Sequence, residues 1–346
     1  MPKDILLIQL KQLGDVLMCT PTFAALTAQY PEARLHLLTM APADQLVAAN
    51  PNIYKTWLFP KKARASAVLH LITQLREQRF ELAVDFYNKP ISAALSWLSG
   101  AKMRIGYNRQ GRRWFYTHPV QPQPTSPYSA AERLALLEPL GIQAANPQLA
   151  LPISPEDQAG ARRILDSLDW DPHRPLITLS PVSRQPYKVW PAERFAQVAN
   201  ALVQDQKAQL LFLWGPGEAH FVEAVRSQLS QADLGDYPVP SLSETVGLLR
   251  LADFHLGNDN GPMHFAIATG CPSLAVFGRP LAENWMPPGS PRHRYVEWDP
   301  GCKRSCHYPK CQLECLQAPA ELVLKGCREL LQKVGEGRRQ ELAALR

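Results

Sequence analysis

The sequence predicts an α/β protein in which parallel sheets are covered by helices. Short apolar runs with β-branched and aromatic residues alternate with longer helical stretches along the whole chain, and this alternation is typical of parallel sheets. The chain has 346 residues, which is more than one core usually supports, so two domains are expected. Residues 141–153 show neither helical nor strand periodicity. They separate two halves that each contain alternating strands and helices.

The apolar runs give the expected strands and the domain limits. The strands are expected at residues 5–10, 34–39, 55–59, 82–86 and 103–107 in the first half, and at 176–180, 209–214, 253–257 and 273–278 in the second. Ser154, Pro155 and Asp157 form a helix-start signal after the separating stretch. We therefore expect domains at residues 1–153 and 154–318, and an amphipathic helix within residues 319–346 that packs back on the body.

The chain carries a formal net charge of +6, and its positive charge is concentrated. Residues 61–113 contain eleven Lys or Arg against three acidic residues. Nucleic acid, an acidic membrane surface and a phosphorylated substrate all suit such a surface, and a solvated surface without a partner is the alternative. No apolar run is long enough to span a bilayer, so a cytoplasmic protein is expected, with its seven cysteines mostly as thiols.

The stretch GNDNGPMHFAIATG, residues 257–270, predicts a short apolar helix with an unusual start. Five residues suited to turning and capping precede or open it: Asn258, Asp259, Asn260, Gly261 and Pro262. Side-chain capping, with Pro262 as the first helical residue, is one interpretation. The other is an anion site, because the free amides and the helix dipole attract a phosphate and Gly261 lets it approach the backbone.

Other polar residues follow the expected strands of both halves. Asp15 comes after the first strand, where it either caps a helix or acts as a general base, and Thr20 with Pro21 predicts that the helix restarts. Ser183, Arg184 and Lys188 follow residues 176–180, as a diphosphate site or a surface loop over a packed Trp190.

Trp214 and Glu218 follow the next strand, where a carboxylate suits ribose hydroxyls. The dinucleotide-binding pattern G-x-G-x-x-G is absent, so nicotinamide chemistry is not favoured.

Four cysteines gather near the C-terminal end of the second half: Cys302, Cys306, Cys311 and Cys315. Their spacings differ from the two-residue knuckles of structural zinc sites. We favour a thiol cluster, or a disulfide formed on handling, over a zinc site.

Taken together, these segments resemble glycosyltransferase family 9, the bacterial heptosyltransferases of lipopolysaccharide core assembly, and are most similar to the heptosyltransferase III branch. The order of the motifs carries the resemblance: ILLIQLKQLGDVLMCTPTFAAL, NPNIYKTWLF, AKMRIGY, SRQPYKVWPAERF, WGPGE and GNDNGPMHFAIATGCPSLAVFG. It implies a GT-B fold of two Rossmann-like domains facing each other across a cleft. The first domain would hold the acceptor and the second the nucleotide sugar.

The resemblance also implies the chemistry and its residues. The reaction would be an inverting, metal-independent transfer of heptose from ADP-heptose, with no cofactor required. Asp15 would be the base, and Lys188 would offset charge on the ADP leaving group. The implied donor-binding residues are Ser183, Arg184, Lys188, Trp214, Glu218, Asp259, Asn260, Gly261 and His264.

The acceptor site is assigned on charge alone, to Arg104, Arg109, Arg112 and Arg113. Two residues depart from the family pattern: Gln9 stands where a lysine is common, and Asn260 where Ser or Thr is usual. The expected partners are a nucleotide sugar and a lipid-linked lipopolysaccharide acceptor, met by a monomer in peripheral contact with the inner face of the inner membrane, and no nucleic acid.

The sequence is also compatible with two other functions. One is a family 9 enzyme with another nucleotide sugar or another glycan acceptor. The other is a basic, non-enzymatic nucleic-acid-binding protein, although no basic helix interleaved with stacking aromatic residues is present.

Overall fold

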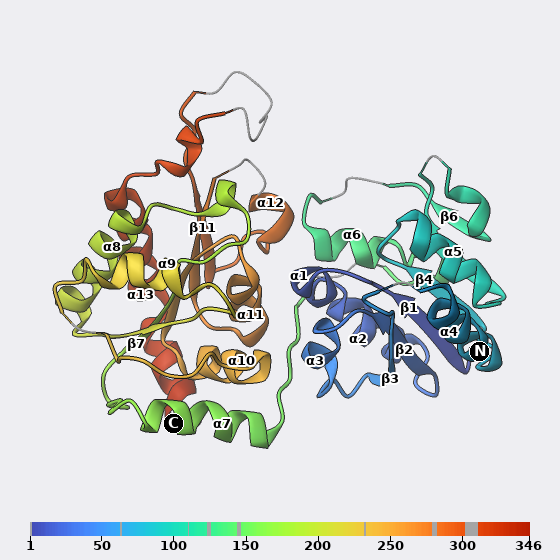
Figure 1. Cartoon of the computed structure of the whole chain (residues 1–346), viewed down its shortest axis with the longest axis horizontal. Coiled ribbons are helices and arrows are strands. Elements are labelled where there is room, and N and C mark those ends of the chain that lie inside the picture. Colours follow the sequence, from blue (N-terminus) through green and yellow to red (C-terminus); the bar gives the residue numbers. More distant parts are fainter. Residues whose placement is uncertain are drawn as a thin grey trace. The chain divides into compact units, whose positions relative to one another are not determined.

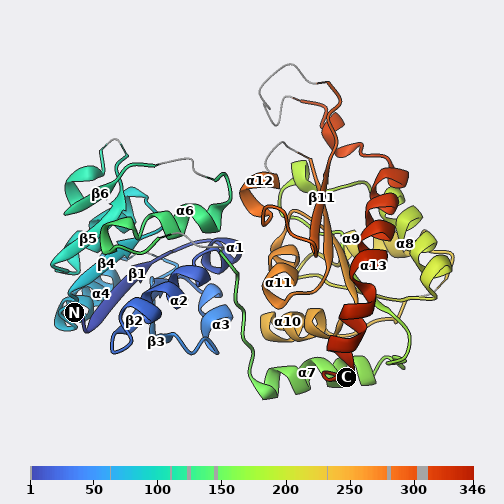
Figure 2. The same ribbon diagram turned by 180° about the vertical axis from the view of Figure 1, so that it is seen from behind.

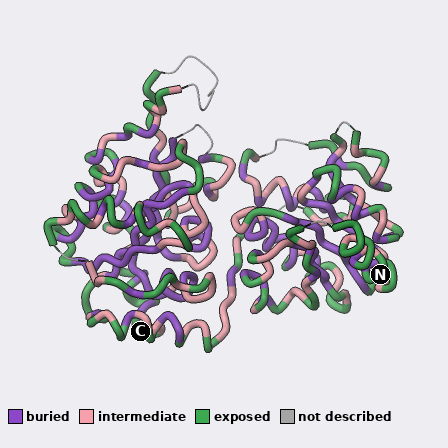
Figure 3. Tube along the Cα trace, viewed as in Figure 1, coloured by how far each residue is buried: buried purple, intermediate pink, exposed green. Residues whose placement is uncertain are grey.

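The structure is a computed structural model that describes residues 2–62, 64–109, 111–122, 126–143, 147–231, 233–278, 282–301 and 311–346. The chain divides into two compact units, Met1–Pro152 and Ile153–Arg346. Each unit is a parallel sheet between layers of helices, with buried strands at its centre (Figures 1 and 3).

The first unit contains a six-stranded parallel sheet in the order β3-β2-β1-β4-β5-β6. Its strands are β1 (Asp4–Ile8), β2 (Arg34–Thr39), β3 (Ile53–Leu58), β4 (Leu82–Asp85), β5 (Met103–Tyr107) and β6 (His118–Val120). The central strand β1 is buried along its whole length, because both of its faces are covered.

Alternate residues of β1 enter two different cores. Leu7 joins the core under one set of helices, α1 (Leu13–Leu17), α2 (Thr20–Gln29), α3 (Ala43–Val47) and α6 (Ser129–Ala135). Leu6 joins the core under the other set, α4 (Ala65–Glu77) and α5 (Pro90–Leu98). The predicted restart of the first helix is confirmed, because α1 ends at Leu17 and α2 begins at Thr20.

The second unit contains a five-stranded parallel sheet in the order β11-β10-β9-β7-β8. Its strands are β7 (Leu176–Ser180), β8 (Gln209–Phe212), β9 (Phe254–Asn258), β10 (Ser273–Phe277) and β11 (His293–Glu297). Its helices are α7 (Pro155–Asp166), α8 (Ala192–Gln206), α9 (Ala219–Arg226), α10 (Leu242–Leu251), α11 (Gly261–Thr269), α12 (Ala282–Trp285) and α13 (Ala320–Ala343).

The C-terminal helix α13 belongs to the body of the second unit. It runs beside α8, as Figure 2 shows. Val323, Cys327 and Leu330 are buried in the same core as the strands. At the other end of the unit, Ser154 caps α7 by accepting a bond from the amide of Asp157 at 3.0 Å, and the predicted helix start is confirmed.

Every strand expected from the apolar runs is present, with small differences at the ends. Two further strands, β6 and β11, were not predicted. Both lie at the edge of a sheet, and neither is an apolar run. Among the residues that the structure describes, no helix is both long and apolar enough to cross a bilayer.

The order of the strands creates one switch point in each sheet. In the first sheet β1 lies between β2 and β4. The next two strands in the chain, β2 and β3, lie on one side of β1, and the later strands β4, β5 and β6 lie on the other side. In the second sheet β7 lies between β8 and β9 in the same way. In open α/β sheets, ligands bind beyond the carboxyl ends of the strands at such a point. The topology therefore marks one candidate site in each unit.

Candidate functional site

Asp15 lies beyond the carboxyl end of β1, at the switch point of the first sheet. It is the third residue of the capping box of α1, in which Gln12 is the N-cap, so its predicted alternative role as the N-cap itself is wrong. Its Oδ2 accepts a bond from the amide of Gln12 at 3.0 Å, and its Oδ1 accepts one from Nη2 of Arg133 at 2.7 Å. The side chain is 26% exposed, so the carboxylate is held in place but open to a ligand.

Arg133 was not predicted as a site residue. It lies on α6, more than a hundred positions along the chain from Asp15, and is 8% exposed. Its Nη1 donates to the carbonyl of Ser129 at 3.0 Å, while its Nε is buried without a hydrogen-bond partner in the described part of the chain. The fold thus places a buried guanidinium against the candidate base.

A pocket of about 190 Å³ opens beside this ion pair. It is formed beyond the carboxyl ends of β4 and β5 and by one side of α6, from Phe86, Tyr87, Asn88, Lys89, Tyr107, Arg109, Arg112, Ser129, Glu132 and Arg133. Four of these residues are cationic and one is acidic. The pocket therefore suits an anionic group.

Asp85 holds residues next to the pocket in place and is itself fully buried at the end of β4. Oδ2 of Asp85 accepts bonds from Ser92 at 2.8 Å and Tyr116 at 2.7 Å, and Oδ1 accepts one from the amide of Asn88 at 3.0 Å. Burial raises the pKa of Asp85 to about 6, against the effect of these bonds. Oδ1 of Asn88 in turn accepts a bond from Nε of Arg112 at 3.1 Å, so this network sets the position of a pocket cation.

The four arginines expected at the acceptor site have different surroundings. Arg109 and Arg112 line the pocket. The guanidinium of Arg104 instead donates to two backbone carbonyl oxygens, at 2.7 and 2.8 Å. Arg113 is exposed and lies over the ring of Trp114, 4.9 Å from its centroid. The structure thus supports a pocket role for the first pair and gives none to the second.

In the second unit, the predicted donor residues gather on the loops after β7, β8 and β9, which are neighbours in the sheet. Lys188 on the first of these loops forms an ion pair with Asp259 on the third, with 2.6 Å between Nζ and Oδ2. The side chain of Lys188 is 27% exposed and that of Asp259 is 8% exposed. The pair therefore bridges the switch point and offers a cation there.

Asn260 confirms the capping interpretation of the unusual helix start. Its Oδ1 accepts a bond from the amide of Met263 at 3.1 Å, and its Nδ2 donates to Oγ of Ser180 at 2.8 Å. The helix begins at Gly261, so the expectation that Pro262 would be the first helical residue is wrong by one position. The side chain of Asn260 fixes the loop after β7 to the start of α11.

Gly261, the first residue of α11, has space for a side chain atom. A Cβ at this position would meet only the ring of Phe265, at an ordinary distance of 3.8 Å. The packing of the chain therefore does not require glycine here. His264, one turn along the helix, is buried against the edge of Trp285, with 5.7 Å between ring centroids.

The loop after β7 carries the predicted Ser183 and Arg184. Ser183 is buried, and its Oγ accepts a bond from the amide of Gln185 at 3.2 Å. Arg184 is exposed. Trp190, at the end of this loop, is buried beneath it as expected.

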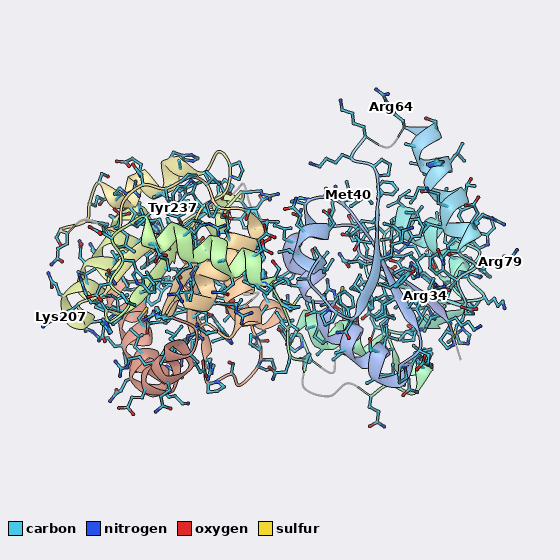
Figure 4. The ribbon with its side chains drawn as sticks, turned by 90° about the horizontal axis from the view of Figure 1, so that it is seen from below. Arg34, Met40, Arg64, Arg79, Lys207 and Tyr237 are labelled. Atoms are coloured by element: carbon cyan, nitrogen blue, oxygen red, sulfur yellow. The ribbon has the colours of Figure 1, made fainter. Side chains whose placement is uncertain are left out.

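The loop after β8 carries Trp214 and Glu218. Trp214 packs edge-on against Tyr237, labelled in Figure 4, with 4.9 Å between ring centroids. Oε2 of Glu218 accepts a bond from the amide of Gly215 at 2.9 Å, which closes the turn. This carboxylate shapes the loop at the strand end where a ribose contact was predicted.

The cysteine cluster is only partly described. Cys302 and Cys306 lie outside the described residues. Cys311 is a free cysteine, as are Cys19, Cys271 and Cys327, in agreement with the expected thiols. Within the described ranges, no group of three His, Cys, Asp or Glu side chains has the arrangement needed to hold a metal ion.

Solved structures share this fold. A glycosyltransferase family 9 protein from Veillonella parvula superposes with a TM-score of 0.86 and 23% identity, over 95% of this chain and 97% of that one. An Escherichia coli protein described as ADP-heptose lps heptosyltransferase II superposes with a TM-score of 0.74 and 21% identity, over 95% and 98%. The expected GT-B class, with two Rossmann-like units, is confirmed.

Sequence comparison leads to the same group of proteins. The chain is 27% identical to lipopolysaccharide heptosyltransferase 3 of Escherichia coli, over 79% of this chain and 83% of that protein. The family model described as glycosyltransferase family 9 (heptosyltransferase) matches residues 68–316, which is more than half of the chain. The protein therefore belongs to glycosyltransferase family 9.

Proposed function

We propose that this enzyme transfers heptose from ADP-heptose to the inner core of lipopolysaccharide, with inversion at the anomeric carbon and without a metal ion. Family membership and the heptosyltransferase names of its relatives support the sugar and the acceptor class. The observation that carries the proposal is the position of Asp15, whose carboxylate lies beside a pocket with four cations.

Asp15 acts as the general base in this proposal. An ionised carboxylate has about four lone-pair positions, and the bonds from Gln12 and Arg133 use two of them. The remaining positions can accept the proton of a sugar hydroxyl as its oxygen attacks the anomeric carbon. A direct attack opposite the ADP leaving group inverts that carbon.

The second unit binds the donor. Lys188 and the positive end of the α11 dipole interact with the diphosphate and offset the charge that develops on ADP as the sugar leaves. Ser183, Trp214 and Glu218 surround the nucleotide from the neighbouring loops. Cation and helix dipole together supply the electrostatic stabilisation that a metal ion supplies in other transferases.

The first unit binds the acceptor. Lys89, Arg109 and Arg112 line the pocket and suit the negative groups of a phosphorylated inner core. Since this acceptor is attached to lipid, the enzyme works as a peripheral monomer at the inner face of the inner membrane. Another nucleotide sugar or another glycan acceptor is the second candidate within the family. Family membership sets aside the non-enzymatic nucleic-acid-binding alternative.

The test is release of ADP from ADP-heptose, with and without a truncated inner-core acceptor. We expect acceptor-dependent release by the natural protein and a loss of at least about a hundredfold in Asp15→Asn, because general-base catalysis contributes factors of this size. Glu77→Gln, which changes an exposed carboxylate on α4, is the matched control and keeps full activity. A folded Asp15→Asn protein with normal turnover would remove the proposed base, and the absence of ADP-heptose binding would remove the proposed donor.

A further inference from the structure

The first unit exposes large apolar side chains close to the acceptor pocket. Ile91 is 43% exposed, Trp97 is 54% exposed and Trp114 is 80% exposed. Soluble proteins seldom expose tryptophan to this extent without a use for it. We call this surface the tryptophan face and define it by Trp97, Arg113, Trp114 and Phe115.

These side chains form one surface because two segments pack together. Trp97 lies near the end of α5, and its side chain is exposed. The ring of Trp97 meets the ring of Phe115 edge-on, with 6.4 Å between centroids. Trp114 is the neighbour of Phe115 in the chain, and the guanidinium of Arg113 lies over its ring.

Two segments of the chain connect the tryptophan face with the acceptor pocket. Lys89, the N-cap of α5, lines the pocket at the start of the helix whose outer side carries Trp97. Arg112 also lines the pocket, and the next two residues belong to the face. A surface that binds the tryptophan face would therefore lie next to the entry of the acceptor.

The chemistry of the face matches the interface of an anionic bilayer. Tryptophan prefers the level of the lipid head groups, where its ring is apolar on one side and its N–H is hydrated. The surrounding segment, residues 61–113, contains eleven cationic and three acidic residues, and cations near an anionic leaflet are attracted to it. Arg64 and Arg79, at the two ends of α4, extend from this segment (Figure 4).

We propose that the tryptophan face docks the enzyme on the surface of an anionic lipid bilayer. Trp114 favours a bilayer over a nucleic acid, because the guanidinium of Arg113 already lies over the ring on which a base would stack. The inference builds on the proposed lipid-linked acceptor, yet docking itself requires neither acceptor nor donor.

Sedimentation with lipid vesicles tests the docking directly in the full chain. We expect binding to vesicles of phosphatidylcholine with phosphatidylglycerol and little binding to phosphatidylcholine alone. The double variant Trp97→Ser, Trp114→Ser weakens binding by at least about tenfold, since two large apolar surfaces no longer insert. Arg113→Gln weakens it by about fivefold, the effect of one cation at an anionic surface.

Two substitutions on α13 serve as matched controls. Leu322→Ser removes a side chain that is 40% exposed, and Arg339→Gln removes an exposed cation. Both keep the binding of the natural protein. Equal losses in the controls and in the tryptophan variants, or unchanged binding in the tryptophan variants, would overturn the proposal. So would binding of single-stranded nucleic acid that competes with vesicles and needs the same two tryptophans.

Activity separates this inference from the proposed function. With a water-soluble, delipidated acceptor, the double tryptophan variant keeps its turnover, because neither residue lines the acceptor pocket. With the lipid-linked acceptor in anionic vesicles, its turnover falls in parallel with vesicle binding. If no protein transfers heptose but vesicle binding still depends on the two tryptophans, the heptosyltransferase assignment fails and the docking surface stands.

Discussion

At the scale of single residues, the contact between Arg133 and Asp15 could not be predicted from the sequence. No local pattern around Arg133 differs from that of an ordinary surface helix, and its role appears only when the fold brings α6 to the carboxyl end of β1. Asp15 could be predicted because it follows a strand and belongs to a recognisable motif. Its partner could not, since a contact over more than a hundred positions leaves no signal in one sequence.

Arg133 is expected to position the carboxylate of Asp15. In Arg133→Met the carboxylate loses one of its two fixed bonds, so turnover falls by about ten- to a hundredfold while the KM for ADP-heptose stays unchanged. Arg133→Lys recovers part of the turnover, because it restores the charge but not the geometry of the guanidinium. Steady-state kinetics check this, and an increase in donor KM instead of a loss of turnover would contradict it.

Asp85 is expected to make stability depend on pH. Its pKa is raised from the ordinary 3.8 to about 6, so the folded protein favours the protonated form. The stability gained from protonation is present below about pH 4 and is lost as the pH rises through about 6. The shift corresponds to about 3 kcal/mol at most in the free energy of unfolding.

Urea unfolding of Asp85→Asn at pH 4 and pH 7 measures this contribution. The natural protein loses stability relative to the variant as the pH rises between these values. Asp166→Asn, on the exposed side of α7, is the control and leaves the pH dependence as it is. A constant difference between natural protein and Asp85→Asn at both pH values would show that the carboxyl of Asp85 does not titrate in this range.

At the scale of elements, the start of α11 offers a test of the anion interpretation. Gly261→Ala adds a methyl group that the fold accommodates, since its nearest neighbour would be 3.8 Å away. We expect the KM for ADP-heptose to rise by about tenfold or more, because the methyl group blocks close approach of the diphosphate to the backbone at the start of the helix. Folding stability stays the same or rises by up to about 1 kcal/mol, as alanine suits helices better than glycine.

The control for this substitution is Gly335→Ala in α13, where a Cβ would meet nothing within 4 Å. It also replaces a helical glycine by alanine, and we expect it to change no kinetic constant. If Gly261→Ala is stable and binds ADP-heptose as well as the natural protein does, the start of α11 serves capping alone.

One physical reason explains why the edge strands β6 and β11 were not predicted. An edge strand pairs on one side only, so it tolerates residues that a central strand excludes. β6 contains Pro119 and two further residues, and β11 begins with His293 and Arg294. Neither is an apolar run, whereas central strands such as β1 and β9 are buried throughout and were predictable from hydrophobicity alone.

At the scale of the whole molecule, each unit has its own switch point and, in the proposed function, its own substrate. Hydrogen exchange of the full chain tests this division. We expect ADP to slow exchange in residues 181–191, 213–218 and 259–265 of the second unit and to leave residues 86–89 and 129–133 unchanged. A soluble inner-core acceptor gives the opposite pattern, and protection of the first unit by ADP alone would contradict the division.

The division into two α/β units followed from the alternation of runs and from chain length, and the motif order pointed to the family. The pocket did not follow, because its residues come from β4, β5 and α6 and share only their place in the fold. Charge alone identified Arg109 and Arg112 but also included Arg104, whose guanidinium binds backbone carbonyls. The charges in a sequence predict which segment is cationic, but they do not predict which group each cationic side chain binds.

If Lys188 binds the donor as proposed, its ion pair with Asp259 means that the diphosphate must replace an anion of the chain. Without a ligand, the ammonium group of Lys188 already pairs with the carboxylate of Asp259, with 2.6 Å between Nζ and Oδ2. An incoming ligand gains only the difference between its own attraction and that of Asp259, so one negative charge brings little advantage and a diphosphate brings more. Under the proposed function, we therefore expect this site to bind ADP more tightly than AMP or inorganic phosphate, so that singly phosphorylated metabolites compete little with the donor.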